Sequence, residues 1–288
     1  MSINRRNFFK ILGVTGITLA TGSKLSANSN PEANKKEFSG VLYDSFRCIG
    51  CQGCERACAK ENNLPAPTEK LKPGIIRETN EKRRTVINAY KTSKGDVHIK
   101  KQCMHCNEPA CVAACLTQAM YKTKEGPVIW RADKCMGCRY CMVSCPFDVP
   151  KFEYHSANPD IVKCTMCYDR LLEGKVPACV FACPAEALVF GTRKELIKEA
   201  RKRIVENPAD YNDAIYGENE AGGTSFLYLS PVPINELGFK ENLQKSSYPA
   251  LTKGFLYGVP SIFVLWPSIL LGLYEASKNK NSKNESHE

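Results

Sequence analysis

The sequence contains no signature of nucleotide binding. It has no Gly-x-Gly-x-x-Gly turn for a dinucleotide and no phosphate-binding loop. Its four histidines, His98, His105, His155 and His287, share no spacing that predicts a catalytic or metal-binding group. The formal charge is +10, but no stripe of basic residues with interleaved aromatics accompanies it. We therefore expect no catalytic residue in this chain and no nucleic-acid partner.

Cysteine, by contrast, is abundant and regularly spaced. The chain of 288 residues has sixteen cysteines, which form four groups of four and leave none over. The groups are Cys48, Cys51, Cys54 and Cys58; Cys103, Cys106, Cys111 and Cys115; Cys135, Cys138, Cys141 and Cys145; and Cys164, Cys167, Cys179 and Cys183. Each group ends with the spacing C-x3-C, and loops of this kind curl around compact iron–sulfur cubes. The count and the spacing predict four [4Fe–4S] clusters.

Disulfides and structural zinc are the alternative uses of these cysteines. Cysteines separated by two or three residues are badly placed for unstrained disulfides. Zinc favours paired C-x2-C motifs, but it does not require a third cysteine two residues on and a fourth three beyond that. Sixteen free thiols would be hard to protect from oxidation. Iron–sulfur ligation is the use that explains the whole pattern.

The sequence repeats itself around the cysteine groups. Residues 41–54 are similar to residues 128–141, and residues 109–115 are similar to residues 177–183. Groups one and three are therefore one repeat type, and groups two and four are the other. In the bacterial ferredoxin run C-x2-C-x2-C-x3-C-P, the last cysteine ligates the other cluster of a pair. Only groups three and four are followed by that proline, but the spacing predicts clusters close enough for electron transfer.

Several charged or titratable residues flank the groups. They are Lys100, Lys101, Arg139, Lys151 and Lys163, and each of them either offsets the negative charge of a cluster or lies on the solvated surface. His105 lies between Cys103 and Cys106. We expect an exposed loop position for this histidine, with a hydrogen bond that tunes a cluster as the alternative.

The N-terminus resembles an export signal. Residues 4–10 are similar to the twin-arginine motif, and a weakly apolar stretch from Ile11 to Ala20 follows that is too short to span a bilayer. The twin-arginine route carries folded proteins, so clusters inserted beforehand would protect the thiols from becoming disulfides. We expect residues 1–27 to be a signal peptide, although residues 25–27 match a cleavage site only loosely. An ordinary amphipathic helix is the alternative.

A second apolar segment lies near the C-terminus. Residues 254–274 contain no charge, and as a helix they would reach roughly 31 Å, enough for one membrane span. Lys278, Lys280 and Lys283 follow the segment, whereas only Lys253 immediately precedes it. The excess of positive charge predicts that the tail is cytoplasmic and that the clusters lie on the other side. A buried or interfacial hairpin is the alternative.

The rest of the chain predicts short elements between the cluster loops. Short strands are expected at residues 128–130 and 187–190. A helix is expected from about Arg193 to Glu206, because Thr192 and Glu195 form a possible capping box. Residues 61–97 are interpreted as a charged insertion, and residues 207–250 as an irregular arm with one strand near 226–229.

The motifs as a set resemble a known family, the four-cluster ferredoxin-like iron–sulfur subunits of DMSO reductase, formate dehydrogenase and polysulfide or nitrite reductase complexes. The similarity is greatest to the HybA-type subunit of hydrogenase-2. It rests on residues 4–8, 42–45, 99–106, 137–143, 149–151, 190–193 and 218–224, together with the cysteine groups and the single C-terminal apolar helix. The resemblance therefore covers nearly the whole chain.

The resemblance implies a ligand set for each cluster. The first set is Cys48, Cys51, Cys54 and Cys183, and the second is Cys58, Cys164, Cys167 and Cys179. The third is Cys103, Cys106, Cys111 and Cys145, and the fourth is Cys115, Cys135, Cys138 and Cys141. Some relatives replace one ligand by Trp and hold a three-iron cluster, but all sixteen cysteines are present here.

The resemblance also implies the architecture, an α+β fold of nested bacterial ferredoxin-like modules with one C-terminal transmembrane helix. The expected parts are a signal peptide (1–27), a linker (28–38), an outer module (39–97 and 156–192), an inner module (98–155), a helix and irregular arm (193–250), a transmembrane helix (254–274) and a cytoplasmic tail (275–288). Each module is expected to hold two clusters.

The function that the resemblance implies is electron transfer by a non-catalytic subunit. Electrons would pass from the small and large subunits of a periplasmic nickel–iron hydrogenase, through the four clusters, to an integral membrane quinone-reactive subunit. The alternative keeps this role but places the chain in a molybdopterin oxidoreductase complex. A cluster-bearing assembly factor is a hypothesis of a different class.

Overall fold

The computed structural model describes residues 37–284, so the predicted signal peptide and the last four residues of the predicted tail lie outside it. The chain divides into two units. One unit is Lys36–Leu251, which contains all sixteen cysteines, and the other contains the C-terminal helix from Thr252 onward. The two units are described separately below.

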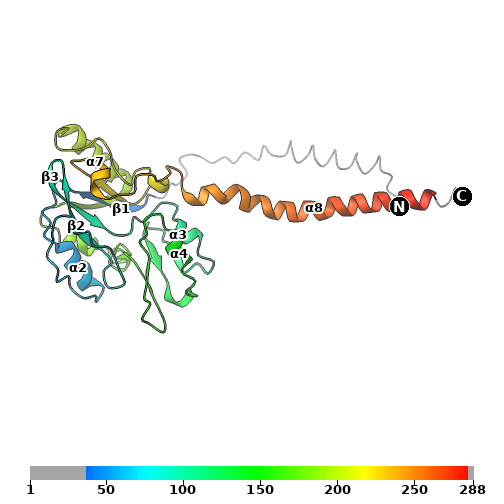
Figure 1. The fold of residues 1–288 in the computed structure, drawn as a ribbon, viewed down its shortest axis with the longest axis horizontal. Helices are drawn as coiled ribbons and strands as arrows, with labels where there is room; N and C mark the ends of the chain where they lie inside the picture. Colours follow the sequence, from blue (N-terminus) through cyan, green and yellow to red (C-terminus); the bar gives the residue numbers. More distant parts are fainter. Residues whose placement is uncertain (1–36, 285–288) are drawn as a thin grey trace. The chain divides into compact units, whose positions relative to one another are not determined.

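A three-stranded sheet forms the centre of the cysteine-bearing unit (Figure 1). Its middle strand is β1 (Ser39–Asp44), which pairs antiparallel with β8 (Leu188–Thr192) and parallel with β9 (Phe226–Leu229). In register, Val41 lies opposite Phe190 on one side and Phe226 on the other. The sheet therefore joins the residues just before the first cysteine group to those just after the last one.

Helix α7 (Arg193–Glu206) covers one face of this sheet. Leu196, Ala200 and Ile204 on the helix are buried against Leu42 of β1 and Leu227 of β9. Because these helical residues are four apart, they form one apolar stripe. The helix begins with a complete capping box between Thr192 and Glu195, as the sequence predicted. The packing of α7 fixes the ends of the central sheet.

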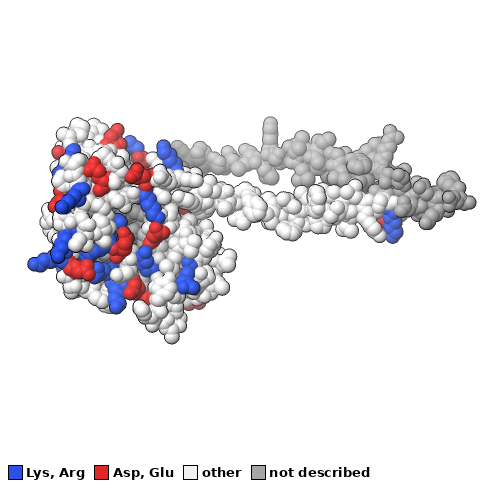
Figure 2. Space-filling view, viewed as in Figure 1, with Lys and Arg blue, Asp and Glu red and all other residues white. Residues whose placement is uncertain are grey.

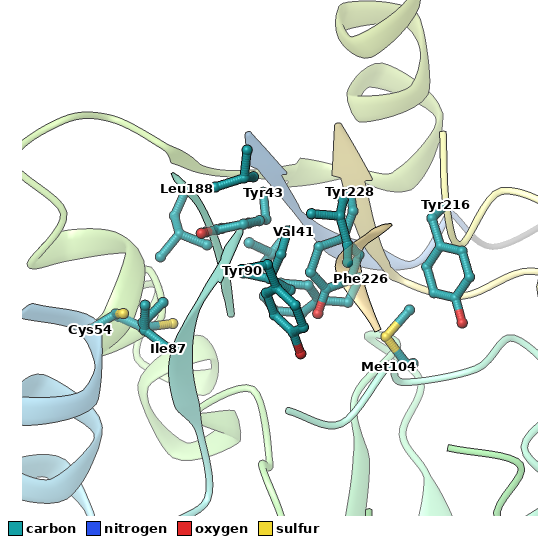
Figure 3. Close-up of a cluster of buried hydrophobic side chains, with 14 of the residues drawn as sticks. Val41, Tyr43, Cys54, Ile87, Tyr90, Met104, Leu188, Tyr216, Phe226 and Tyr228 are labelled. Carbon is teal, nitrogen blue, oxygen red and sulfur yellow. The ribbon is translucent and has the colours of Figure 1, made fainter. Parts of the chain in front are cut away.

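The opposite face of the sheet holds the main hydrophobic core (Figure 3). Tyr43, Phe226 and Tyr228 project into it from β1 and β9, and Tyr43 and Tyr228 meet edge to face at 5.6 Å. The hairpin of β2 (Val86–Thr92) and β3 (Gly95–Lys101) completes this core. Cys54, Cys106 and Cys179 are buried in the same cluster of side chains. The core thus packs directly against the cysteine loops.

Two pairs of short helices carry the C-x3-C segments. Helix α2 (Gly53–Glu61) packs against α6 (Ala178–Phe181), and α3 (Ala110–Ala113) packs against α4 (Tyr140–Val143). Two small hairpins accompany them, β4 (Met120–Lys122) with β5 (Val128–Trp130) and β6 (Lys151–Phe152) with β7 (Ile161–Val162). The remaining elements are α5 (Tyr168–Leu172), η1 (Ala132–Lys134), η2 (Glu220–Gly222) and η3 (Ile234–Leu237).

The C-terminal helix α8 (Tyr248–Asn284) is longer than the predicted span of 254–274. Its segment Tyr248–Glu275 is long and apolar enough to cross a membrane. Figure 2 shows this segment without charged side chains along most of its length. Pro260 and Pro267 both lie inside the helix.

Most of the short elements predicted from the sequence are present. The strand at 128–130, the helix at 193–206 and the strand at 226–229 match β5, α7 and β9, and the strand predicted at 187–190 is β8. The mixed α/β ferredoxin-like fold with one long apolar C-terminal helix is confirmed. The sequence analysis missed the hairpin β2–β3, because the strand Val86–Thr92 lies within residues 61–97, which were interpreted as a charged insertion. The boundaries of the nested modules stay a prediction.

A buried ion pair joins β1 to α7. Asp44, which is fully buried, accepts hydrogen bonds from Arg203 Nη1 at 2.9 Å and from the Tyr211 hydroxyl at 2.8 Å. Its other oxygen accepts from the backbone N–H of Phe46 at 3.1 Å. Burial and the neighbouring carboxylate raise the pKa of Tyr211 to about 12, so Tyr211 stays a donor at neutral pH.

Replacing Asp44 by Ala should destabilise this unit strongly. The substitution removes the shared acceptor of Arg203, Tyr211 and the Phe46 N–H, and it leaves Arg203 only its more exposed partner Glu199 at 2.8 Å, a loss of about 3–5 kcal/mol. At about 2–4 °C per kcal/mol, the thermal midpoint should fall by at least about 6 °C. Circular dichroism of the full-length protein in detergent measures it. The control is Glu173→Ala, which removes an exposed ion pair with Lys175 and should cost about 1 kcal/mol or less. Equal midpoints for the two variants would contradict the prediction.

Candidate cluster-binding sites

The cysteines of the first predicted set line one cavity. Cys48, Cys51 and Cys54 reach it from the loop before α2 and from the first turn of α2, and Cys183 reaches it from the residues after α6. Tyr43, Ile87 and Leu188 of the main core form the apolar part of its wall. The cavity contains about 340 Å³ of space without protein atoms, part of it open to solvent. Distant parts of the chain are thus joined here around four thiols.

The cysteines of the third predicted set line a second cavity of nearly the same size, about 350 Å³. Cys103, Cys106 and Cys111 come from the loop after β3 and from α3, and Cys145 follows α4. The wall also includes Lys163. The repetition of the sequence is therefore matched by two cavities with the same kind of lining.

In the second and fourth predicted sets, the thiols affect one another's pKa values. Burial is the largest cause that raises the pKa of the Cys58 thiol, and the charges of Cys164, Cys179 and Cys167 raise it further. The charge of Lys100 acts in the opposite direction and lowers this pKa. Burial and the charges of Cys115, Cys135 and Cys138 raise the pKa of the Cys141 thiol to about 11. The thiols of Cys58, Cys164, Cys167 and Cys179 thus lie near one another, as do those of Cys115, Cys135, Cys138 and Cys141, and their division into ligand sets stays a prediction.

The loops that carry the cysteines curl through left-handed backbone positions. In the first C-x2-C pair of each group the residue before the second cysteine has a positive φ: 66° at Gly50, 48° at His105, 71° at Gly137 and 56° at Met166. A side chain at position 50 would collide with the His98 ring, and the positive φ favours glycine there. Such turns bring backbone N–H groups toward sulfur, as in the bond from Met166 N to Cys164 Sγ at 3.3 Å.

The position of His105 differs from the sequence prediction. We expected an exposed loop residue, but His105 is fully buried. Its Nδ1 accepts a hydrogen bond from the Val128 N–H at 2.9 Å, so the ring proton lies on Nε2. Burial and the charges of Lys163, Lys122 and Lys100 hold its pKa well below the usual value, so the ring is neutral. The expectation was wrong because β9 packs on this loop, where the Phe226 N–H donates to the Met104 carbonyl at 3.1 Å.

The donor set fits iron–sulfur clusters. All sixteen cysteines are free thiols, and soft thiolate sulfur is the ligand that these clusters select. Two buried N–H donors near the sites, His105 Nε2 and Trp130 Nε1, have no partner among the described residues. Within residues 37–284 no three metal-binding side chains lie close enough to share a single ion. The thiols that line the two cavities fit iron–sulfur clusters by their chemistry, and the assignment of each ligand stays a prediction.

Sequence reasoning also missed residues that line or support the sites. Tyr43 lines the first cavity, and its hydroxyl donates to the His98 carbonyl at 2.7 Å. Gln102 donates to the Tyr228 hydroxyl at 2.5 Å. The alignment of Tyr43 with Trp130 in the internal repeat was the available signal for the first of these. No local pattern indicated the second, because Tyr228 lies 126 residues from Gln102.

The flanking basic residues fall into two classes. Lys100 and Lys163 are only 1% and 3% exposed, so a solvated surface position is wrong for both. Lys101 and Lys151 are partly exposed and Arg139 is exposed. Lys101 forms an ion pair with Glu78 at 3.2 Å, and Arg139 lies over the ring of Phe152 at 5.3 Å. Only the two buried lysines have an environment that requires a special explanation.

Comparisons with known proteins agree with this reading of the sites. Residues 97–193 match the family model of a 4Fe-4S dicluster domain. The chain is 46% identical to a protein of Nitratidesulfovibrio vulgaris over 96% of this chain and 78% of the relative. It is 34% identical to the hydrogenase-2 operon protein HybA of Escherichia coli O157:H7, over 99% of this chain and 98% of the relative. It is also 34% identical to the formate dehydrogenase-O iron-sulfur subunit of Escherichia coli K12, over 76% of each chain.

Substitutions on α2 and α6 test the crossed pairing of the cysteines. Cys48→Ser and Cys183→Ser should alter the same electron paramagnetic resonance signal of the reduced protein, because both thiols line the first cavity. Cys58→Ser and Cys179→Ser should alter a second signal. Each variant should lose up to a quarter of the iron and acid-labile sulfide.

The matched control is Ala182→Ser, which places the same side chain between the two cysteines that follow Pro177. Its iron content and signals should equal those of the unmodified protein. If Cys179→Ser and Cys183→Ser altered one and the same signal, the crossed ligation would be wrong.

Proposed function

Because the chain belongs to the family of HybA-type iron–sulfur subunits, which share the dicluster domain with the iron–sulfur subunits of formate dehydrogenases, we propose that it relays electrons from a periplasmic nickel–iron hydrogenase to a membrane quinone-reactive subunit. The single observation that carries the proposal is the presence of four groups of four thiols, two of them around matching cavities. Bound clusters would supply one-electron chemistry.

The ligand sets proposed for the four sites are those that the resemblance implied. Sites one and two share α2 and α6, because each C-x3-C segment contributes one cysteine to each site. Sites three and four share α3 and α4 in the same way. The charge of Cys164 in site two raises the pKa of Cys103 in site three, which supports their closeness. The proposed order is therefore one, two, three and four.

The two ends of this order have exposed cysteines. Cys51 of site one and Cys138 of site four are the cysteines that are exposed, and they occupy the same position in the internal repeat. Large apolar side chains lie near them in the chain and are exposed too, including Ile49 at 63% and Val143 at 81%. Clustered apolar surface beside a terminal site favours a protein partner there. We propose that electrons enter at one end and leave at the other.

The residues around the inner sites exclude water. Cys58 and Cys179 of site two and Cys103, Cys106 and Cys111 of site three are buried, and the main core covers Cys106 and Cys179. Dry surroundings and hydrogen bonds to sulfur are the means by which a protein adjusts cluster potentials. The chain's own work is thus to hold the groups in sequence and to set their electrostatic environment.

Helix α8 is proposed as the membrane anchor. The cysteine-bearing unit is connected to it at Ser247, whose hydroxyl donates to Glu108 at 2.5 Å, between Cys106 and Cys111 in the sequence. The lysines after the apolar segment favour a cytoplasmic C-terminus and therefore support a periplasmic position for the clusters. The twin-arginine-like N-terminus supports the same location. Export by this route remains part of the proposal.

A molybdopterin oxidoreductase is the second candidate complex. The relation to formate dehydrogenase iron–sulfur subunits favours it, because that similarity covers 76% of the chain. The anchor and the cluster order would be unchanged, and only the electron donor would differ. The greater coverage by the HybA relative supports the hydrogenase.

Purification from the native membrane tests the donor. Gentle detergent extraction should bring down a nickel–iron hydrogenase pair and a multi-span membrane protein, identified by mass spectrometry. Hydrogen should then reduce the clusters of the purified complex. A molybdopterin subunit together with reduction by formate would instead assign the chain to the second candidate complex.

The role as an electron carrier is tested by Cys179→Ser. The substitution should abolish hydrogen-dependent quinone reduction while leaving hydrogen oxidation with a soluble dye intact, because the dye accepts electrons before the interrupted site. Ala182→Ser should leave both activities unchanged. Loss of the dye-coupled activity as well would indicate an assembly role.

A charge at the centre of α8 should weaken membrane attachment. Leu265→Lys places an ammonium in the middle of the apolar segment, which costs about 2.5–3.5 kcal/mol in a bilayer. More of the protein should then be released from membranes by alkaline carbonate, measured by immunoblotting. Leu251→Lys near the start of the helix is the matched control and should stay bound. Equal release of the two variants would argue against a spanning helix.

A further inference from the structure

The buried charges of the cysteine-bearing unit do not balance among themselves. Its buried carboxylates are Asp44 and Glu55, and both are paired: Asp44 with Arg203 at 2.9 Å and Glu55 with Arg77 at 2.5 Å. Two further buried cations, Lys100 and Lys163, form no ion pair with a carboxylate in the part of the chain that the structure describes. Burying an unpaired ammonium is costly. An anion must therefore accompany these lysines.

Lys163 lies between the second and third sites. Its side chain lines the cavity formed by Cys103, Cys106, Cys111 and Cys145, which is the third site. Its Nζ donates to the carbonyl of Cys164, a cysteine of the second site, at 3.0 Å, and also to the Val128 carbonyl. Carbonyl groups orient the ammonium but do not neutralise it.

Lys100 lies against the main core, whose buried cluster contains Phe226 together with Cys54 of the first site and Cys179 of the second. Its ammonium donates to Gln102 Oε1 at 2.9 Å and lies 5.1 Å from the centre of the Phe226 ring. Gln102 is held in turn by Tyr228, so the ammonium is fixed by neutral groups. Burial alone would lower the pKa of Lys100, but the thiols of Cys179, Cys54, Cys164 and Cys58 raise it above the ordinary value. These thiols belong to both sites.

We propose that Lys100 and Lys163 are resident counter-cations of the electron-transfer chain, which raise the reduction potentials of the clusters at the two junctions between sites one, two and three. The physical reason is electrostatic. Reduction adds one negative charge to a cluster, and a fixed cation in a medium of low dielectric constant stabilises the more negative state. The inference rests on the proposed function, because it requires clusters in these sites.

The neighbouring Lys101 provides the comparison within the same strand. Lys100 and Lys101 are consecutive in β3, so their side chains point to opposite faces of the hairpin. Lys101 is partly exposed and pairs with Glu78 at 3.2 Å. Its charge is therefore both neutralised and screened by solvent. A general effect of net charge would be the same for the two lysines, whereas a junction effect belongs to Lys100 alone.

The test is a redox titration of the full-length cluster-loaded protein, followed by electron paramagnetic resonance. Lys100→Met and Lys163→Met keep the side-chain length and remove the charge, and Lys101→Met is the control. Signals are assigned to sites one, two and three with the Cys48→Ser, Cys58→Ser and Cys103→Ser proteins. At the midpoint potential of the unmodified protein, Lys100→Met should lower the reduced-to-oxidised ratio of sites one and two at least tenfold, a shift of about 59 mV for a one-electron couple.

Lys163→Met should do the same for sites two and three, and Lys101→Met should leave every ratio within twofold. Unchanged ratios in Lys100→Met and Lys163→Met at full iron content would overturn the inference. Loss of iron from these variants, with normal potentials in the clusters that remain, would also overturn it in favour of an assembly role. Absence of four clusters from the unmodified protein would instead count against the proposed function, so the two failures are distinguishable.

Discussion

The pairing of β1 with β8 and β9 is the interaction on which the rest of the structure depends. The proposed first site requires Cys183 to meet Cys48, which line one cavity, and the proposed second site requires Cys58 to meet Cys164. Closing such long loops costs entropy, and no thiol contributes to stability before the loop is closed. Backbone hydrogen bonds between Ser39–Asp44 and Leu188–Thr192 close these loops. Helix α7 stabilises the paired strands through the packing of Leu196 and the ion pair of Arg203 with Asp44. The cysteine loops are then held in place by elements that contain no cysteine.

Electrostatics sets the second requirement. A site for electron transfer has to be dry enough to keep reorganisation small, but burial disfavours every charge that the site needs. The described chain meets this requirement in two ways: it pairs buried carboxylates with arginines, and it leaves two buried lysines beside the thiols. The raised pKa values of Cys54, Cys111 and Cys167, each about 12, show the size of the burial effect in the protein alone. A bound iron core and nearby cations are what make a thiolate stable there.

The two copies of the internal repeat have the same local structure but lie in different surroundings. Residues 41–54 and 128–141 fold into the same strand, left-handed turn and helix, and they present Cys51 and Cys138 at the surface. The surroundings differ because β9 and the hairpin β2–β3 cover only the first copy. The main core lies on that side, whereas the second copy is enclosed by a small cluster around Met120, Val128 and Ile161. One local design is thus placed in two different environments.

The sequence by itself determined the chemistry and much of the local structure. Sixteen cysteines at fixed spacing predict four-thiol sites, and the capping box at Thr192 predicts where α7 begins, because both signals depend on residues only a few positions apart. Only the tertiary structure decided the burial of His105, Lys100 and Lys163. Strand β9, which packs on the His105 loop and on Lys100, is more than a hundred residues away from both, and Val128, whose carbonyl binds Lys163, is 35 residues away from it. The hairpin Val86–Lys101 was missed for a related reason, because its apolar residues form a core only by packing against the distant residues Tyr43 and Phe226. Local spacing indicates the kind of ligand that the chain offers, and long-range packing decides which cysteine groups meet and what charge and solvent surround them.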